Sequence, residues 1–234
     1  MLAARPMNEA DALVAVLAEE RGAWRGLVRG GLSRRHAATW QTGNLLALRW
    51  MARLDTQLGT VTGELVHASA APVLDDPLAL AILQSACALA ELALPEHEPH
   101  PRLFRGLVHL LAHLPEGPPR LADLVRWEAA LLEELGYGLD LTVCAVSGAT
   151  SGLAYVSPRT GRAVAAPAAG VWASRLLPLP GFLLGGEGSW PDWQAGLALT
   201  GHFLARDALG ALHRPLPAAR LRLSDLVARQ GGLG

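Results

Sequence analysis

The sequence predicts an α+β protein, with a small β-barrel over residues 1–70 and an α-helical region over residues 71–234. Three observations lead to this prediction. Short runs of alternating apolar and polar residues extend to His67, apolar residues recur with helical spacing after Asp76, and Gly or Pro separates the runs. The chain has 234 residues, of which 51% are hydrophobic, and this is enough for one large domain or two small ones.

Short strands are expected throughout the first part of the chain. The clearest alternation places Leu46, Leu48 and Trp50 on one face of a strand and Arg49 on the other. Glu20-Arg21-Gly22 is expected to form a tight turn between the first two strands. The expected strands cover residues 13–18, 23–29, 44–54 and 58–67. Four or more short strands in so few residues indicate a small barrel.

Helices are expected in the second part of the chain. Asp75 or Asp76 can cap the first helix, with Pro77 in its first turn. Gly136 is a natural residue to end the third helix. The helices are expected at about residues 77–94, 102–114, 121–135, 193–211 and 218–229. Residues 141–190 are rich in Gly, Pro and Ser, and we expect an irregular insert there.

Arginine is concentrated in the predicted barrel. Residues 21–53 contain seven arginines and no acidic residue, although the formal net charge of the whole chain is −1. A block of one charge indicates a binding face. Every basic residue is arginine, so the sequence excludes chemistry that needs a lysine amine, such as a Walker A phosphate loop or a Schiff-base enzyme.

The cysteines and the hydrophobic segments give the expected location. Cys87 and Cys144 are too few for a disulfide framework, and Cys87 is expected in the core of a helix. The longest apolar stretch, about residues 78–94, is interrupted by polar residues and is too short to span a bilayer. Since the N-terminus lacks the pattern of a signal peptide, we expect a soluble cytoplasmic protein.

The arginine block contains tryptophans, a combination that favours nucleic-acid binding. Arginine pairs with phosphates, and aromatic rings stack on bases. Trp40 lies beside a basic loop and is the best stacking candidate, whereas Trp24 and Trp50 fall on apolar faces and are expected in the core. The candidate nucleic-acid contacts are Arg25, Arg29, Arg34, Arg35, Trp40, Arg49 and Arg53. The alternative is that these arginines are only the solvated outer faces of strands.

The sequence contains no recognisable catalytic constellation. The segment 97–100, His-Glu-Pro-His, differs in spacing from a zinc-protease motif, and Pro99 interrupts the helix that such a motif needs. His109 and His113 stand at i and i+4 on a helix, a spacing that can bind a metal ion. No third ligand is evident, so we expect both histidines to be surface residues. We expect Glu128, Glu133 and Glu134 to lie on a solvated face or to form caps or ion pairs, rather than to act as an acid/base couple.

Two segments carry a family resemblance. The first contains Arg5-Pro6, Glu9, Glu20-Arg21-Gly22, Val28-Arg29-Gly30-Gly31 and Arg34-Arg35. The second contains Arg126-Trp127-Glu128, Leu131-Leu132, Leu135-Gly136-Tyr137-Gly138, Leu141 and Cys144. In this order and at this separation, the two segments resemble motifs of the RecO family of bacterial repair and recombination mediators. Weaker similarity continues to residues 215–217, so the resemblance covers most of the chain.

The resemblance implies an N-terminal OB-fold, a helical C-terminal region and no catalytic chemistry. It implies binding to single- and double-stranded DNA, promotion of annealing, and cooperation with RecR in loading RecA onto single strands coated by SSB. It also implies that the acidic C-terminal tail of SSB docks in the helical region, where Arg126 and Leu135 lie in the matching motif. An arginine at the rim of a helical groove suits such a tail. The alternative is that Leu135 is a core residue and Arg126 only a surface cation.

Three features depart from the family pattern. Family members usually begin with a longer segment that forms the first barrel strand, so here that strand is expected to be missing or the start codon to be misassigned. Some relatives bind zinc through two C-x-x-C pairs, but Ser147 stands at the position paired with Cys144, and we expect neither zinc nor another cofactor. Trp40-Gln41-Thr42 replaces a frequent L-Q-P and is expected to alter how the basic loop is held.

The leading interpretation is a DNA-binding recombination mediator that is not an enzyme. One alternative is a protein-interaction scaffold without direct DNA binding, which predicts weak binding with little salt dependence. The other alternative is a hydrolase, which predicts a pocket that gathers His97, His100, Glu128 and Glu134.

Overall fold

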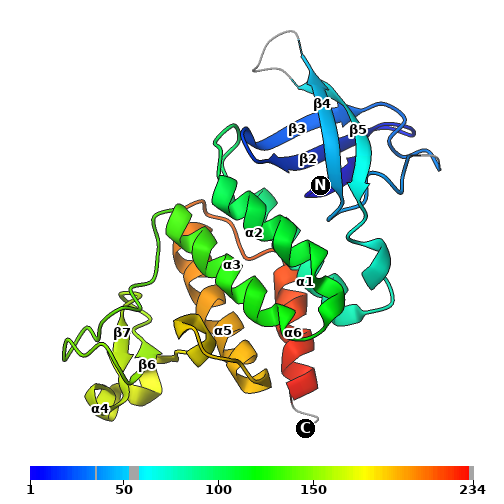
Figure 1. The fold of residues 1–234 in the computed structure, drawn as a ribbon. Coiled ribbons are helices and arrows are strands. Elements are labelled where there is room, and N and C mark those ends of the chain that lie inside the picture. The colour runs from blue at the N-terminus through cyan, green and yellow to red at the C-terminus, as the bar shows by residue number, and fades with distance from the viewer. Residues whose placement is uncertain (35, 53–57, 232–234) are drawn as a thin grey trace. The chain divides into compact units, whose positions relative to one another are not determined.

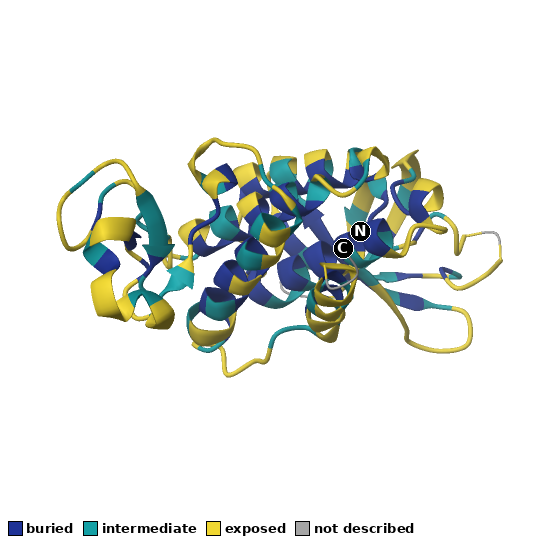
Figure 2. Ribbon diagram, turned by 90° about the horizontal axis from the view of Figure 1, so that it is seen from below, coloured by how far each residue is buried: buried dark blue, intermediate teal, exposed yellow. Residues whose placement is uncertain are grey.

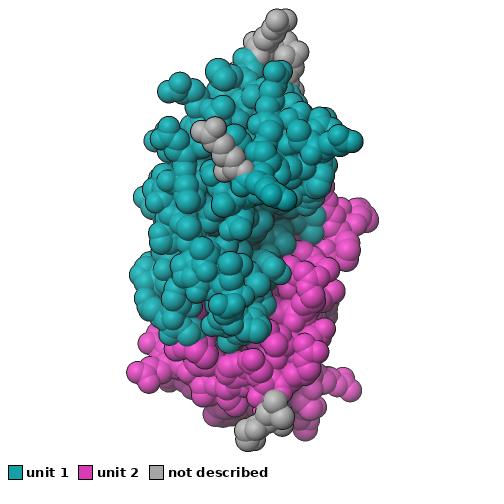
Figure 3. All heavy atoms as spheres, turned by 90° about the vertical axis from the view of Figure 1, so that its right-hand side faces the viewer, with its two compact units in different colours: residues 1–117 teal, residues 118–234 magenta. Residues whose placement is uncertain are grey.

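The computed structural model describes residues 1–34, 36–52 and 58–231 of the chain (Figure 1). Its internal contacts divide the chain into two compact units, Met1–Gly117 and Pro118–Gly234 (Figure 3). The predicted α+β class is confirmed, because a β-sheet comes first and most of the helices follow it. The first two long helices belong to the same compact unit as the N-terminal sheet.

The first unit is built on a sheet that has five strands among the described residues, in the order β1-β2-β3-β5-β4. Its strands are β1 (Ala3–Pro6), β2 (Ala12–Ala18), β3 (Gly22–Val28), β4 (Leu45–Met51) and β5 (Gly59–His67). Neighbouring strands are antiparallel except β3 and β5, which are parallel. The four predicted strands are confirmed. The expected loss of the first strand is wrong, since Ala3–Pro6 pairs with β2.

One face of this sheet is buried because alternate residues of β2 point to the same side. Ala12, Val14 and Val16 form a core with Val28, Trp40 and Val61. Gly26 of β3 has no side chain on this face, where a Cβ would lie 2.2 Å from a methyl of Val61. Within the described residues no ladder of hydrogen bonds joins β1 to β4, so the sheet is not a closed barrel.

Two helices complete the first unit, α1 (Pro77–Ala93) and α2 (Pro101–Ala112), with short 3₁₀ turns at Ala71–Val73 and Leu114–Glu116. Asp76 is the residue that caps α1, because its carboxylate accepts hydrogen bonds from the backbone N–H groups of Leu78 (2.9 Å) and Ala79 (3.1 Å). Cys87 is fully buried in α1, which confirms its predicted place in the core.

The second unit contains three long helices, α3 (Arg120–Glu134), α5 (Trp190–Phe203) and α6 (Ala218–Gly231). Helix α3 packs on α5, and α5 packs on α6. A π-helical turn, Leu204–Ala208, follows α5. Along the helices the buried residues lie on one side and the exposed residues on the other (Figure 2). In the part of the chain that the structure describes, no helix is both long and apolar enough to cross a membrane.

Residues 141–190 are not irregular as predicted, because they contain a small sheet with the order β7-β6-β8. Its elements are β6 (Leu153–Val156), β7 (Ala163–Ala165), α4 (Ala166–Ala169), the 3₁₀ helix η3 (Gly170–Arg175), β8 (Leu177–Pro178) and the 3₁₀ helix η4 (Gly181–Leu184). A small core of Cys144, Val164, Ala165 and Ala169 holds this sheet together. The strands are too short to produce a recognisable alternation in a sequence rich in Gly and Pro.

Candidate nucleic-acid interface

A pocket of about 330 Å³ opens in the N-terminal sheet. It exists because β3 pairs with β5 at only two positions, Gly26↔Gly59 and Leu27↔Thr60, so the first half of β3 diverges from β5. We call it the Arg–Trp pocket. Its lining residues are Val16, Ala18, Arg21, Trp24, Arg25, Leu48, Arg49, Trp50 and Val61. The pocket therefore combines an apolar wall with three arginines.

Two tryptophans form the aromatic part of the Arg–Trp pocket. The ring centroids of Trp24 and Trp50 lie 4.7 Å apart in an edge-to-face arrangement, and both rings are only partly buried. The imidazole of His97 also lies against Trp24 in an edge-to-face arrangement, with a centroid distance of 4.0 Å. The Trp24 indole N–H donates a hydrogen bond to the carbonyl of Arg21. These contacts fix the two rings while each keeps some surface for a planar ligand group.

The arginines of the Arg–Trp pocket are exposed, and only one of the three pairs with an acidic residue among the described residues. Arg25 pairs with Glu96 at 2.7 Å, with both side chains more than two-fifths exposed (47% and 42%). A surface ion pair of this kind contributes at most about 1 kcal/mol, so a phosphate can replace the carboxylate. Within the described residues, Arg21 and Arg49 have no carboxylate partner. The pocket therefore offers net positive charge beside its aromatic rings.

The structure separates the seven predicted nucleic-acid contacts into different groups. Arg25 and Arg49 line the Arg–Trp pocket. Arg29 and Arg34 are exposed but are not part of its lining. Two further predicted residues, Arg35 and Arg53, lie outside the described residues.

The prediction that Trp40 stacks on bases is wrong. Its side chain is only 5% exposed and belongs to the core of the sheet. The ring fits there because Gly63 on β5 has no side chain, and a Cβ at that position would approach the Trp40 ring to 3.1 Å. A ring that is 5% exposed has almost no surface to offer a base.

The sequence interpretation missed three residues of the Arg–Trp pocket. The sequence pattern predicts Arg21 in a turn and Trp24 and Trp50 in the core. The rings do pack against the core, but their outer parts also line the pocket. The close spacing of Arg21, Trp24 and Arg25 was the available signal, since an arginine–tryptophan–arginine cluster at a strand start is a natural site for phosphate and base together.

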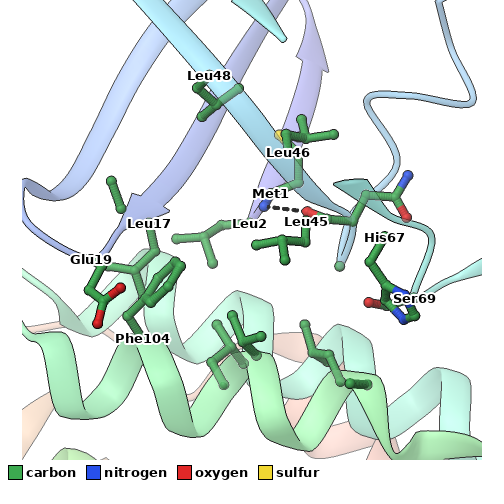
Figure 4. Close-up of a pocket in the computed structure, with 17 residues that line it drawn as sticks. Met1, Leu2, Leu17, Glu19, Leu45, Leu46, Leu48, His67, Ser69 and Phe104 are labelled. Atoms are coloured by element: carbon green, nitrogen blue, oxygen red, sulfur yellow. Dashed lines mark hydrogen bonds between the residues drawn. The ribbon is translucent and has the colours of Figure 1, made fainter. Parts of the chain in front are cut away.

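A second pocket of about 380 Å³ lies between the sheet and α2 (Figure 4). Leu17, Leu46 and Leu48 on the sheet side face Phe104 and Leu107 on the helix. The N-terminal amine of Met1 donates a 2.9 Å hydrogen bond to the Asn44 carbonyl, and burial lowers the pKa of this amine. Because the lining is mainly apolar and contains no arginine, this pocket suits an apolar group rather than a phosphate.

The predicted partner-binding residues of the second unit do not come together in one groove. Nine positions separate Arg126 from Leu135, so the helical period places them on opposite sides of α3, roughly 180° apart. Arg126 donates hydrogen bonds to Asp123 (3.0 Å) and to the Phe182 carbonyl (3.3 Å), and its guanidinium lies over the Phe182 ring. Leu135 is the partly buried C-cap residue of α3. Their role in partner binding stays a prediction.

The surroundings of Cys144 do not fit the zinc site that some relatives carry. Its sulfur accepts hydrogen bonds from the backbone N–H groups of Ala165 (3.2 Å) and Ser147 (3.4 Å), and these lower the pKa of the thiol to about 6. Cys87 and Cys144 are both free thiols. Among the described residues, no group of three or more His, Cys, Asp and Glu side chains is placed to hold a metal ion.

The residues of the hydrolase alternative are already engaged in other contacts. Glu128 is completely buried and binds Arg220 through two hydrogen bonds of 2.6 and 3.1 Å, so its carboxylate is not available as a base. His97 packs on Trp24, and the side chain of His100 is 95% buried. Glu128 was expected as part of a solvated face or of an ion pair, and the structure shows the ion pair.

The fold and the Arg–Trp pocket define an α+β protein that presents arginine and tryptophan together on its N-terminal sheet. Two family models match the chain: Recombination protein O N terminal over residues 1–69, and Recombination protein O C terminal over residues 74–215. The chain therefore belongs to the RecO family, which confirms the predicted resemblance.

Similar curated proteins carry the name DNA repair protein RecO. The protein from Granulibacter bethesdensis is 55% identical, and the match covers 97% of this chain and 93% of that protein. The protein from Gluconacetobacter diazotrophicus is 53% identical over 97% of this chain and 92% of its own length. The protein from Acidiphilium cryptum is 55% identical over 98% and 94% of the two chains.

Proposed function

We propose that this chain is a DNA repair and recombination mediator that binds DNA through the Arg–Trp pocket and acts by binding rather than by catalysis. The observation that carries the proposal is that Arg21, Arg25 and Arg49 gather around the edge-to-face pair of Trp24 and Trp50. Cations at this position can neutralise phosphates, and the rings can stack on bases. The names of the relatives support the same process.

We assign the N-terminal sheet to the OB-fold. The strand order β1-β2-β3-β5-β4 with a parallel β3–β5 pair corresponds to the partly open, five-stranded Greek-key barrel of that fold. The Met1 carbonyl accepts a hydrogen bond from the Gly43 N–H (3.0 Å), so the start of the chain already approaches the segment that enters β4. OB-folds bind oligonucleotides on the face of strands 2 and 3, and the Arg–Trp pocket includes residues of both strands.

The proposal includes the partners that family membership supports. The protein would bind single- and double-stranded DNA and promote annealing, because contacts with phosphates are common to both forms. The helical unit would recruit RecR and the acidic C-terminal tail of SSB, with Arg126 exposed for the latter, so that RecA reaches strands coated by SSB. We place this activity in the cytoplasm, at the nucleoid. The scaffold alternative keeps the protein partners and lacks the DNA contact.

The experiment is a salt series of fluorescence-anisotropy titrations with a labelled single-stranded oligonucleotide. It compares the wild type with the variant Arg21→Ala/Arg25→Ala/Arg49→Ala. For single strands the slope of log K against log salt is about −0.7 per phosphate neutralised, so the variant is expected to be flatter by up to about 2 and to bind more weakly. The matched control, Arg159→Ala/Arg222→Ala/Arg229→Ala, removes the same charge from exposed positions of the second unit.

The proposal fails if the pocket variant and the control have equal slopes and equal affinities. Weak binding by the wild type itself, without salt dependence, would favour the scaffold alternative.

A further inference from the structure

A large aromatic side chain is exposed in the second unit, outside the Arg–Trp pocket. Trp172 is 58% exposed and its neighbour Val171 is 88% exposed. Both belong to η3, and the helical turns beside the small sheet are largely exposed in Figure 2. The exposure does not come from a loose segment, because the neighbouring residues Ala173 and Leu176 pack against the small core around Cys144. The segment is anchored, and it presents the indole outward.

The ring of Trp172 already carries a cation. The guanidinium carbon of Arg175 lies 5.1 Å from the centroid of the Trp172 ring. This arrangement follows from the local fold, since side chains at i and i+3 of a 3₁₀ helix lie one above the other. The stacked pair holds the positive charge close to the ring, and the 58% exposure leaves ring surface for a second planar group.

The charge around this pair suits a polyanion. Residues 141–186 contain three arginines, Arg159, Arg162 and Arg175, and no acidic residue. Arg162 is paired with Asp140 at 3.3 Å, just outside that range. Within the described residues Arg175 has no carboxylate partner, so its charge is free to pair with an added anion.

We propose that Trp172 and Arg175 form a second contact for single-stranded nucleic acid, an inference that rests on the proposed DNA binding of the chain. An unpaired base stacks on the exposed ring surface of Trp172, while Arg175 pairs with an adjacent phosphate. A duplex keeps both faces of each base stacked, so it offers only its phosphates to this contact. The contact therefore favours single strands over duplexes.

The test compares Trp172→Ala with Trp172→Phe in the full chain, by anisotropy with labelled single-stranded and duplex DNA. Loss of one base–aromatic stack corresponds to about 5- to 150-fold in affinity, so Trp172→Ala is expected to weaken single-strand binding at least about fivefold. Trp172→Phe keeps a stacking surface and should retain most of the affinity. Duplex binding should change little in either variant. Circular dichroism checks that both variants are folded.

Two further arms locate the contact. An oligonucleotide carrying 5-iodo-deoxyuridine should photo-crosslink to a peptide that contains Trp172, as identified by mass spectrometry. Arg175→Ala should weaken single-strand binding more than the matched variant Arg159→Ala, which removes one exposed arginine of the same insert outside η3.

The outcomes separate this inference from the proposed function. If Trp172→Ala leaves single-strand binding unchanged while the Arg–Trp pocket variant loses it, the second contact is overturned and the proposed function stands. If the reverse is found, the contact at Trp172 stands and the site in the sheet fails. If Trp172→Ala leaves DNA binding unchanged and alters only the oligomeric state of the protein in sedimentation, the exposed Trp172 binds a protein surface. In that case the inference is overturned.

Discussion

Glu128 and Arg220 form an ion pair that has no access to solvent. Their side chains are 0% and 1% exposed, and the other hydrogen-bonding groups of the pair are also satisfied. Arg220 donates to Ser224 Oγ (2.6 Å) and to the Leu197 carbonyl (2.7 Å), and the Thr200 hydroxyl donates to Glu128. A buried pair with complete hydrogen bonding adds little net stability, but removing one partner leaves an uncompensated buried charge.

We therefore predict that Glu128→Ala lowers the free energy of unfolding by about 3 to 5 kcal/mol, because it leaves the Arg220 guanidinium buried without its counter-charge. The double variant Glu128→Ala/Arg220→Met should lose clearly less than the sum of the two single variants. Urea denaturation followed by circular dichroism measures both. The control is Asp140→Ala, which removes an exposed carboxylate that pairs with Arg162 and accepts hydrogen bonds from Thr142, and it should cost about 1 kcal/mol. Equal losses for Glu128→Ala and Asp140→Ala would contradict the prediction.

At the scale of single elements, the spacing of apolar residues in the sequence predicts the long helices and strands well and the short strands poorly. The helices from Pro77, Pro101, Arg120 and Ala218 are found within about two residues of their expected starts, since caps and apolar periodicity are local signals. The strands β6, β7 and β8 were missed because none exceeds four residues. The extent of the β3–β5 pairing, which opens the Arg–Trp pocket, depends on contacts between distant segments and leaves no local pattern.

The small sheet takes part of its stability from an ionised Cys144, which has a pH-dependent consequence. Hydrogen bonds from Ala165 and Ser147 lower the pKa of this thiol from 9.0 to about 6 in the folded protein. Between these values the unfolded thiol holds a proton that the folded one has lost, so stability rises with pH. The contribution is complete above pH 9 and is lost as the pH falls through 6.

We predict that Cys144→Ala destabilises the protein more at pH 8 than at pH 6, as measured by urea denaturation at the two values. The control is Cys87→Ala, because burial raises the pKa of that thiol to about 11 and it stays protonated over this range in the folded protein. Its destabilisation should be nearly the same at both pH values. A chelator should leave the wild-type transition unchanged. A loss for Cys144→Ala that does not depend on pH would contradict the prediction.

At the scale of the whole molecule, the sequence indicated the α+β class and the RecO family but not how the chain divides. The change from strands to helices near residue 70 is visible in the sequence, and the two family models also meet there. The first compact unit extends further, to Gly117. Its boundary depends on which elements pack together and not on whether they are strands or helices. Trp40 and Trp24 illustrate the same limit at the candidate site, where only the three-dimensional packing shows which ring is enclosed.

The contacts within the first unit indicate why α1 and α2 belong with the sheet. Both helices contact β2, and Leu17 of that strand shares an apolar pocket with Phe104 and Leu107 of α2. Ala23 at the start of β3 forms an isolated bridge with Glu96 in the segment between the helices, and the Ala23 carbonyl accepts a hydrogen bond from the His97 N–H (3.0 Å). A sheet without these helices would expose the apolar residues that they cover.

We therefore predict that residues 1–117 form an independently folded fragment, whereas residues 1–70 do not. The longer fragment keeps the apolar contacts of β2 and the edge of β3 that Glu96 and His97 cover, so it should unfold in one cooperative transition on heating. The shorter fragment exposes both and should show little cooperative change in circular dichroism, with a tendency to associate. A fragment of residues 1–70 that unfolds as sharply as residues 1–117 would show that the sheet is stable by itself. In that case the Arg–Trp pocket would not need Glu96 and His97 to hold the first half of β3 in place.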